Sequence, residues 1–370
     1  MIFKRIYIFF FTYMAAMYFS GTLLVFWLSK NGFNFSDLII YFLITFLVGL
    51  ISILYLPKNN MSSKKTIFWG IILNLSYILI LIKIFHPAQL YVSAILSGLN
   101  IVYFWIPVNA MYFKYSSEEK RGLNSGLFFL ITPIIGITLQ PLAGMIAEKF
   151  GFEIMFCIGI LLYFIPIFLI RYLPDFQWNL DIRKELKILK FNWSTFFQGM
   201  SSRLNYSLIG IFTLFFIKTP SGFGNFFGYL ALVAGIASLL NGYISDKIKN
   251  RKYFFYLFSS LAVLSFIPLA FAENPYYWGF FAGISSLCIY LANPFWFAFN
   301  LDYYKEIGVK KTMVLREVFL NLGYVFNLLI VALVFSFTGS TKISLLVISI
   351  ICCLLPIASY FQGVYRNKNA

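Results

Sequence analysis

The amino-acid sequence predicts an all-α integral membrane protein with twelve membrane-spanning helices. Only 11% of the 370 residues are charged, whereas charged residues make up about a quarter of a water-soluble domain. Apolar runs of about 20 residues, the length that crosses a bilayer as a helix, follow one another along the chain. Lys and Arg residues lie mostly in alternate connections between these runs, as expected of a chain that crosses a membrane repeatedly.

The first apolar run is predicted to be the first membrane helix. It is too long for the hydrophobic region of a secretory signal, and no small-residue cleavage site follows it. The predicted spans cover residues 6–28, 37–56, 66–85, 88–113, 122–147, 152–173, 192–217, 223–245, 253–272, 275–300, 312–336 and 342–363.

The distribution of Lys and Arg also predicts the orientation. If the amino terminus is cytoplasmic, the connections rich in Lys and Arg are cytoplasmic, which is the usual arrangement. An even number of spans returns the carboxyl terminus to the same side. We therefore predict a multi-pass protein of the cytoplasmic membrane, surrounded by membrane lipid, with both termini in the cytoplasm.

The longest connection, residues 174–191, divides the spans into six and six. Trp178, Ile182, Leu186 and Leu189 recur there at helical spacing among charged residues, as in an amphipathic helix on a membrane surface. Both halves place a Pro and an Asn late in their fourth span and enter the next span through an Arg. Such six-helix repeats are typical of transporters. The predicted domains are a bundle over 1–174, a cytoplasmic amphipathic linker over 175–191 and a bundle over 192–370.

The stretch GYISDKIKNRKYFF, residues 242–255, concentrates charge between two apolar runs. It resembles the cytoplasmic loop motif of the major facilitator superfamily, Gly-x-x-x-Asp-Arg/Lys-x-Gly-x-Arg. Gly242, Asp246, Lys247 and Arg251 match the motif, and Lys249 replaces its second Gly. The first-half copy should lie near residues 50–65, where no carboxylate occurs.

The fifth span extends this resemblance, because it shows the Arg-Gly start and the Gly and Pro residues that the family often has there. The matching residues are Arg121, Gly122, Gly136, Pro141, Gly144 and Gly151. Gly136, Pro141 and Gly144 partly match a pattern of the family's exporters, which favours export, although Gln140 and Met145 depart from it.

The resemblance implies a monomeric secondary transporter that moves a small solute across the membrane by alternating access, with no cofactor. It also implies a gate, in which Asp246 lies against the start of the fifth span near Arg121 and holds the cytoplasmic side closed. The alternative is that the loop is only a cluster of positive charge on the inner side. That alternative does not explain Asp246.

Charged residues inside a span are candidates for function, because a charge in the bilayer is costly. Arg203 lies about 11 residues into its span, near mid-depth. Two interpretations remain open: Arg203 binds an anionic substrate, or it forms an ion pair with Glu317 in its own half. Glu317, beside Arg316, is the candidate for coupling transport to protons. The alternative is that Arg316 and Glu317 are residues of the inner membrane interface.

In the superfamily, the first, fourth, seventh and tenth spans line the substrate cavity. Polar or aromatic residues at mid-depth in these spans are therefore candidates for substrate contact, although each is as well explained by helix packing. With Arg203, the candidates are Asn205, Tyr206, Tyr13, Asn100, Tyr103, Tyr290 and Asn293.

Other classes of function are disfavoured. The net charge of +16 is spread over the gaps between apolar runs, so we expect no nucleic-acid partner. One His, and four Cys without a CxxC pair, predict no metal site. A polytopic membrane enzyme needs clustered acid–base or metal residues, and the sequence offers few. A transport-inactive membrane sensor, the other alternative, would be expected to carry a soluble domain.

Overall fold

The computed structural model describes the chain except residues 1, 56–60, 85, 116–120, 179–181, 183–190, 248–250, 305–307 and 364–370. It gives the backbone but not the side chains of residues 2, 113, 121–129, 178, 205–206, 241–247, 251–252, 298, 301–303 and 309. The helices of the first half are α1 (Ile2–Gly21), α2 (Leu24–Lys30), α3 (Phe35–Tyr55), α4 (Ser63–Ile82), α5 (Ala88–Asn100), η1 (Ile101–Trp105), α6 (Ile106–Lys114), α7 (Arg121–Phe150), α8 (Phe152–Leu169) and η2 (Ile170–Tyr172).

The second half is also helical, and two short strands complete the described structure. Strand β1 (Met61–Ser62) pairs antiparallel with β2 (Gln177–Trp178). The helices are α10 (Trp193–Arg203), η3 (Leu204–Leu208), α11 (Ile209–Phe216), α12 (Pro220–Lys247), α13 (Arg251–Leu264), α14 (Phe266–Leu269), α15 (Pro275–Tyr303), α16 (Val309–Thr338), α17 (Thr341–Cys352) and α18 (Leu354–Phe361).

The length and composition of these helices make the chain an all-α, multi-pass membrane protein. In the described part, 10 helices are long and apolar enough to cross a membrane. Two predicted spans fall on other helical stretches: 253–272 on the shorter apolar helix Tyr253–Leu269, and 192–217 on α10, η3 and α11. Large apolar side chains such as Leu161 and Phe164 remain exposed on the outside of the bundle, where lipid is the solvent that suits them.

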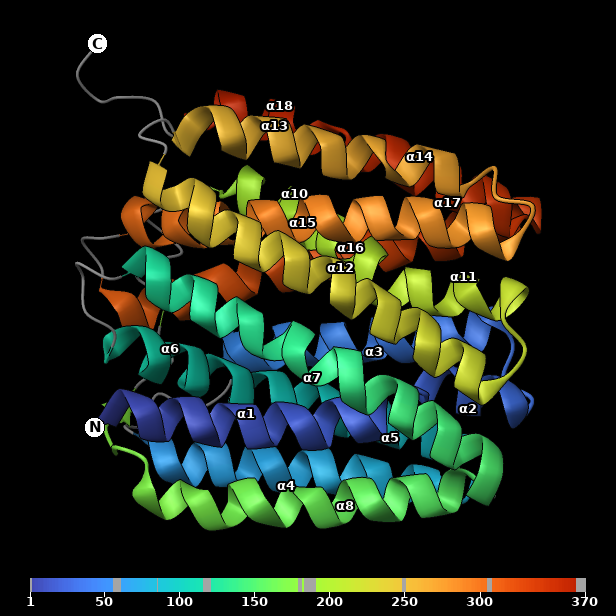
Figure 1. The fold of residues 1–370 in the computed structure, drawn as a ribbon, viewed down its shortest axis with the longest axis horizontal. Coiled ribbons are helices and arrows are strands. Elements are labelled where there is room, and N and C mark those ends of the chain that lie inside the picture. Colours follow the sequence, from blue (N-terminus) through green and yellow to red (C-terminus); the bar gives the residue numbers. More distant parts are fainter. Residues whose placement is uncertain are drawn as a thin grey trace.

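The helices lie roughly side by side, and α1 begins at the same end of the bundle at which α18 finishes (Figure 1). We call this end, marked by Phe3 and Phe361, the near end. The opposite end, marked by Lys30 and Thr338, is the far end. Figure 1 also shows the first half, in blue and green, lying beside the second half, in yellow to red.

Two helix pairs provide the main contacts between the halves: α7 with α12, and α3 with α16. The α7–α12 contact depends on glycine. A Cβ atom on Gly144 would lie 2.6 Å from the carbonyl oxygen of Pro220 and 3.1 Å from Cα of Gly224. The two backbones therefore touch directly, which only small residues permit. Gly136 and Pro141, which the sequence also singled out, contact Ala231 and Gly228 across the same interface.

The connection between the halves is held to both of them at the near end. Asp175 accepts hydrogen bonds from Ser62 Oγ at 2.8 Å, from Ser63 Oγ at 3.0 Å and from the backbone N of Lys64 at 3.3 Å, at the first turn of α4. Two residues further on, the carbonyl oxygen of Gln177 accepts a hydrogen bond from Lys310 Nζ of the second half at 2.7 Å.

Asp175 thus brings a carboxylate to a part of the first half whose own loop sequence carries none. Residues 174–176 have no regular secondary structure, and Gln177 begins β2. Of the amphipathic helix predicted over 175–191, residues 179–181 and 183–190 lie outside the described residues.

Replacing Asp175 by alanine is expected to destabilise the folded protein by about 1 kcal/mol at neutral pH, because Ser62, Ser63 and the backbone N of Lys64 lose their shared hydrogen-bond acceptor at the first turn of α4. Partial burial opposes ionisation, but the hydrogen bonds outweigh it and hold the pKa of Asp175 below its ordinary value. A lowered carboxyl pKa stabilises the fold above the pKa of the unfolded chain, and this contribution is lost as pH falls through the folded-state value. The wild-type protein and Asp175→Ala should therefore differ in their midpoints of thermal unfolding at about pH 7, and this difference should disappear at about pH 3.

The matched control is Glu273→Ala, which removes an exposed carboxylate from the connection before α15. It should unfold like the wild-type protein throughout this pH range. A difference between wild type and Asp175→Ala that stays constant with pH would contradict the stabilising role of the Asp175 carboxylate.

Candidate functional site

A cavity of about 560 Å³ lies between the two halves. The first half contributes residues of α1 to α7, and the second half contributes residues of α10, η3, α11, α12, α15 and α16. Cavities of this size hold small organic ligands, and such cavities are mostly apolar with a few polar groups. The position between two halves with extensive mutual contact makes this cavity the candidate substrate site.

Two short π-helical turns border the cavity, and each follows a polar residue that lines it. Asn100 precedes η1, and Arg203 precedes η3. A π-turn inserts extra backbone into a helix and is frequent at functional sites. Asn100 is buried: its Nδ2 donates to the carbonyl oxygen of Gly70 at 2.7 Å, and its Oδ1 accepts a long hydrogen bond from the Tyr13 hydroxyl at 3.5 Å.

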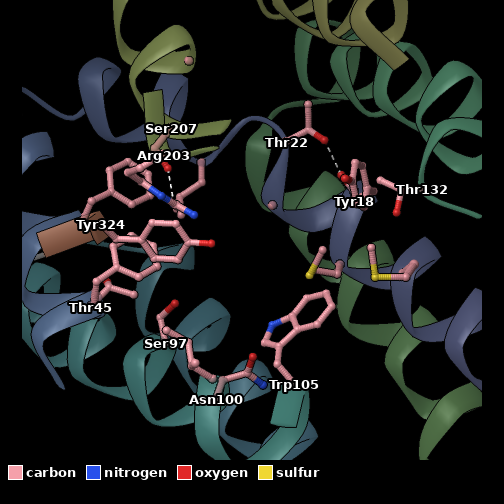
Figure 2. Close-up of a pocket in the computed structure, with 18 of the residues that line it drawn as sticks. Tyr18, Thr22, Thr45, Ser97, Asn100, Trp105, Thr132, Arg203, Ser207 and Tyr324 are labelled. Carbon is pink, nitrogen blue, oxygen red and sulfur yellow. Dashed lines mark hydrogen bonds between the residues drawn. The ribbon is translucent and has the colours of Figure 1, made fainter. Parts of the chain in front are cut away.

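Arg203 extends from α10 into a corner formed by two aromatic rings. Its Cζ atom lies 4.0 Å from the ring centre of Phe46 in α3 and 4.4 Å from that of Tyr324 in α16. The two rings are 4.9 Å apart and inclined at 66°, so they cover one side of the guanidinium. Nη1 donates to Ser207 Oγ. Figure 2 shows Arg203, Ser207 and Tyr324 together on one side of the cavity, across from Trp105.

Arg316 and Glu317, neighbours in α16, form an ion pair on the same wall of the cavity. Arg316 Nη1 lies 2.9 Å from Glu317 Oε1, and both side chains are almost completely buried. The guanidinium of Arg316 also lies 4.6 Å from the ring centre of Phe297 in α15. The Arg316–Glu317 pair therefore lies on α16, whereas Arg203 enters the cavity from α10.

The two walls of the cavity differ in chemistry. Among the side chains that the structure describes, the charged ones that line the cavity are Arg203, Arg316 and Glu317, all from the second half. The polar lining residues of the first half are uncharged hydroxyl and amide side chains. They are Tyr18, Thr22, Tyr41, Thr45, Asn74, Tyr77, Ser97, Asn100, Asn109, Thr132 and Gln140. The cavity therefore has one charged wall and one neutral polar wall.

The substrate contacts predicted from sequence fall into three groups. Arg203, Asn100 and Tyr290 line the cavity, as do both predicted coupling residues, Arg316 and Glu317. In the described part of the chain, Tyr13, Tyr103 and Asn293 do not line the cavity. Tyr13 is fully buried, and its ring stacks on that of Phe104 with 3.4 Å between ring centres. Asn293 is also buried. Asn205 and Tyr206 belong to η3, but their side chains lie outside the described residues.

The predicted gating residues lie at helix ends. Gly242, Asp246 and Lys247 belong to the last turns of α12, Arg251 is the first residue of α13, and Arg121 is the first residue of α7. The side chains of all five are outside the described residues, so their contact stays a prediction.

Several lining residues escaped the sequence analysis because it considered four spans only. Phe46 in α3, Gln140 in α7 and Phe227 in α12 all line the cavity. The chain contains 46 Phe residues, so no pattern distinguishes Phe46 or Phe227 from those that face lipid. Gln140 did carry a signal, since an amide in the middle of an apolar run is uncommon.

Neither models of known protein families nor the curated proteins include a match to this chain. Among the described residues, no group of three or more His, Cys, Asp or Glu side chains is placed to hold a metal ion.

Proposed function

We propose that the protein is a secondary transporter that moves a small solute by alternating access, with the twelve-span fold of the major facilitator superfamily. The observation that carries this proposal is the cavity between the halves, bordered by the helix pairs α7–α12 and α3–α16. Such transporters bind substrate near the midplane between two repeats, which rock around the site. The proposed membrane is the cytoplasmic membrane, with the near end of the bundle in the cytoplasm.

Contacts at each end of the cavity are compatible with such rocking. At the far end, Phe35 in α3 contacts Phe335 in α16 at 4.7 Å between ring centres, and Glu148 in α7 accepts a hydrogen bond from Ser221 N in α12 at 2.8 Å. At the near end, α6 contacts α16 and Lys310 reaches Gln177. In the proposed cycle these two sets of contacts break in turn.

The predicted gate fits the same cycle. Helices α7 and α12 pack against each other, and Figure 1 shows α7 beginning and α12 ending toward the near end. The start of α7, at Arg121, and the end of α12, at Asp246 and Lys247, are therefore on neighbouring helices. An interaction there would hold the near end closed.

We further propose that Glu317 couples transport to protons. Its ion pair with Arg316 borders the cavity, so a proton reaching the carboxylate would cancel its charge and release the guanidinium. Proton relays in membrane transporters are built from such intramembrane carboxyl groups.

Alternating access is tested without knowledge of the substrate by a cysteine in the cavity wall. In a variant whose four native cysteines are replaced, Ser97→Cys places a thiol on the neutral wall of the cavity. A membrane-impermeant thiol reagent is applied to one face or the other of sealed vesicles. We expect Ser97→Cys to react from either face, because the cavity opens to each in turn.

The matched control is Ser93→Cys, one turn earlier in α5, where the side chain is fully buried. It should resist the reagent from both faces. Reaction of Ser97→Cys from only one face would contradict alternating access and favour a fixed cavity, as in an enzyme or a sensor.

A further inference from the structure

The chemistry of the cavity indicates a class of substrate. We propose that the site binds a small organic anion with one net negative charge and an apolar body, and that Arg203 binds its anionic group. This inference rests on the proposed transport function, because it names the substrate of the same cavity.

The first step concerns charge. Two guanidinium groups and one carboxylate line the cavity, which gives its described lining a net charge of +1. The surroundings are apolar protein and lipid, in which an isolated charge is costly. A ligand with one negative charge would make the occupied cavity neutral. A cation would instead raise the charge of the closed site to +2.

The second step concerns geometry. Phe46 and Tyr324 cover one side of the Arg203 guanidinium. This cation–π contact stabilises the positive charge of Arg203. Guanidinium N–H groups lie in one plane and point outward from its edge, which matches the two oxygens of a carboxylate or phosphate. The aromatic corner fixes the orientation of that plane at the cavity wall, so the site is preorganised for an anion.

The third step concerns Glu317, the one described acidic residue that lines the cavity. An ammonium group on the ligand would need this carboxylate, which is already paired with Arg316 at 2.9 Å. Breaking that pair would leave a buried guanidinium without its partner, at a large cost. The site therefore discriminates against cations and favours anions.

The remaining lining defines the body of the ligand. Aromatic side chains of both halves surround the cavity, among them Phe10, Trp105, Phe227 and Tyr290. The neutral wall offers amides such as Asn74 and Asn109, which can bind a hydroxyl or carbonyl but cannot neutralise a second charge. The expected ligand is accordingly aromatic or aliphatic, with a single anionic group.

The test uses matched probes with one phenyl body: phenylacetate (anion), phenylacetamide (neutral), phenethylamine (cation) and phenylmalonate (dianion). Each is added to the purified full-length protein, and the midpoint of thermal unfolding is followed as a function of concentration, since a ligand of the folded state raises it. We expect phenylacetate to bind at least about tenfold more tightly than the other three. Arg203→Gln should remove this preference, and Arg203→Lys should retain part of it, because it keeps the charge but not the planar fork.

The matched control is Arg171→Gln, which removes an exposed guanidinium that lies over Phe168 and Tyr172 outside the cavity. It should bind phenylacetate like the wild-type protein. Equal stabilisation by phenylacetate and phenylacetamide, no stabilisation by any anionic probe, or an unchanged preference in a folded Arg203→Gln protein would overturn the assignment. If Ser97→Cys still reacts from both faces, these results reject the substrate class and leave the transport function standing.

Discussion

Gly144→Trp is expected to hold the far end of the cavity open and to stop transport while the protein remains folded in the membrane. The new side chain has no room between α7 and α12, because even a Cβ atom at this position meets the backbone of Pro220. Overpacking of this kind costs about 1–3 kcal/mol. Only conformations in which the two helices touch bear that cost, so the population should shift away from them by about 5- to 150-fold.

The measurement is the reactivity of Ser97→Cys in the Gly144→Trp background. Reaction from the face at the far end should persist, and reaction from the near end should be lost. Leu142→Trp is the matched control, since Leu142 lies on the same helix with 41% of its surface exposed and a larger side chain can extend into lipid. If Ser97→Cys in the Gly144→Trp background reacts from both faces, as it does in the Leu142→Trp background, then α7 and α12 do not part at the far end during the cycle.

Glu317→Gln is expected to lower the free energy of unfolding by about 3–5 kcal/mol, because it leaves the guanidinium of Arg316 buried without its charged partner. Combining it with Arg316→Gln should restore part of the loss, since the double variant buries no unpaired charge. Unfolding of the wild type, both single variants and the double variant gives the interaction energy of the pair. Single variants as stable as the wild type would show that water in the cavity already screens the pair.

The same variant tests proton coupling. Glutamine resembles the protonated carboxyl group and cannot release a proton. Uptake of phenylacetate into proteoliposomes should respond to a pH gradient in the wild-type protein and not in Glu317→Gln. The control is Glu273→Gln, an exposed acid outside the cavity. A wild-type flux that ignores the gradient would favour facilitated diffusion.

The sequence predicted the helical membrane fold because lipid imposes a simple requirement: each crossing needs about 20 apolar residues. It did not predict the π-turns at Ile101–Trp105 and Leu204–Leu208, since their composition does not differ from that of the flanking α-helix. The interruption between Gly21 and Leu24 in the first span was also not predicted. These local departures depend on tertiary packing, which a hydropathy pattern does not record.

Within the site, the sequence identified Arg203, Asn100 and Glu317 because charges and amides are rare in apolar runs. It did not identify Phe46, whose role depends on the position of Arg203 in another half of the chain. Asp175 is a similar case: its partners Ser62 and Ser63 lie more than 100 residues away. Contacts between distant segments have no periodic signature in one sequence.

The attachment of the connecting segment limits how far the two bundles can separate on that side. Asp175 is bonded to one bundle, and Gln177, two residues later, is bonded to the other. Two residues of extended chain span only about 7 Å, so a wider opening requires one attachment to dissociate. The single lysine bond is the weaker of the two, so it is the attachment expected to break first when the bundles separate. In the proposed cycle, the resistance to opening on that side would therefore include this bond as well as the contact of α6 with α16.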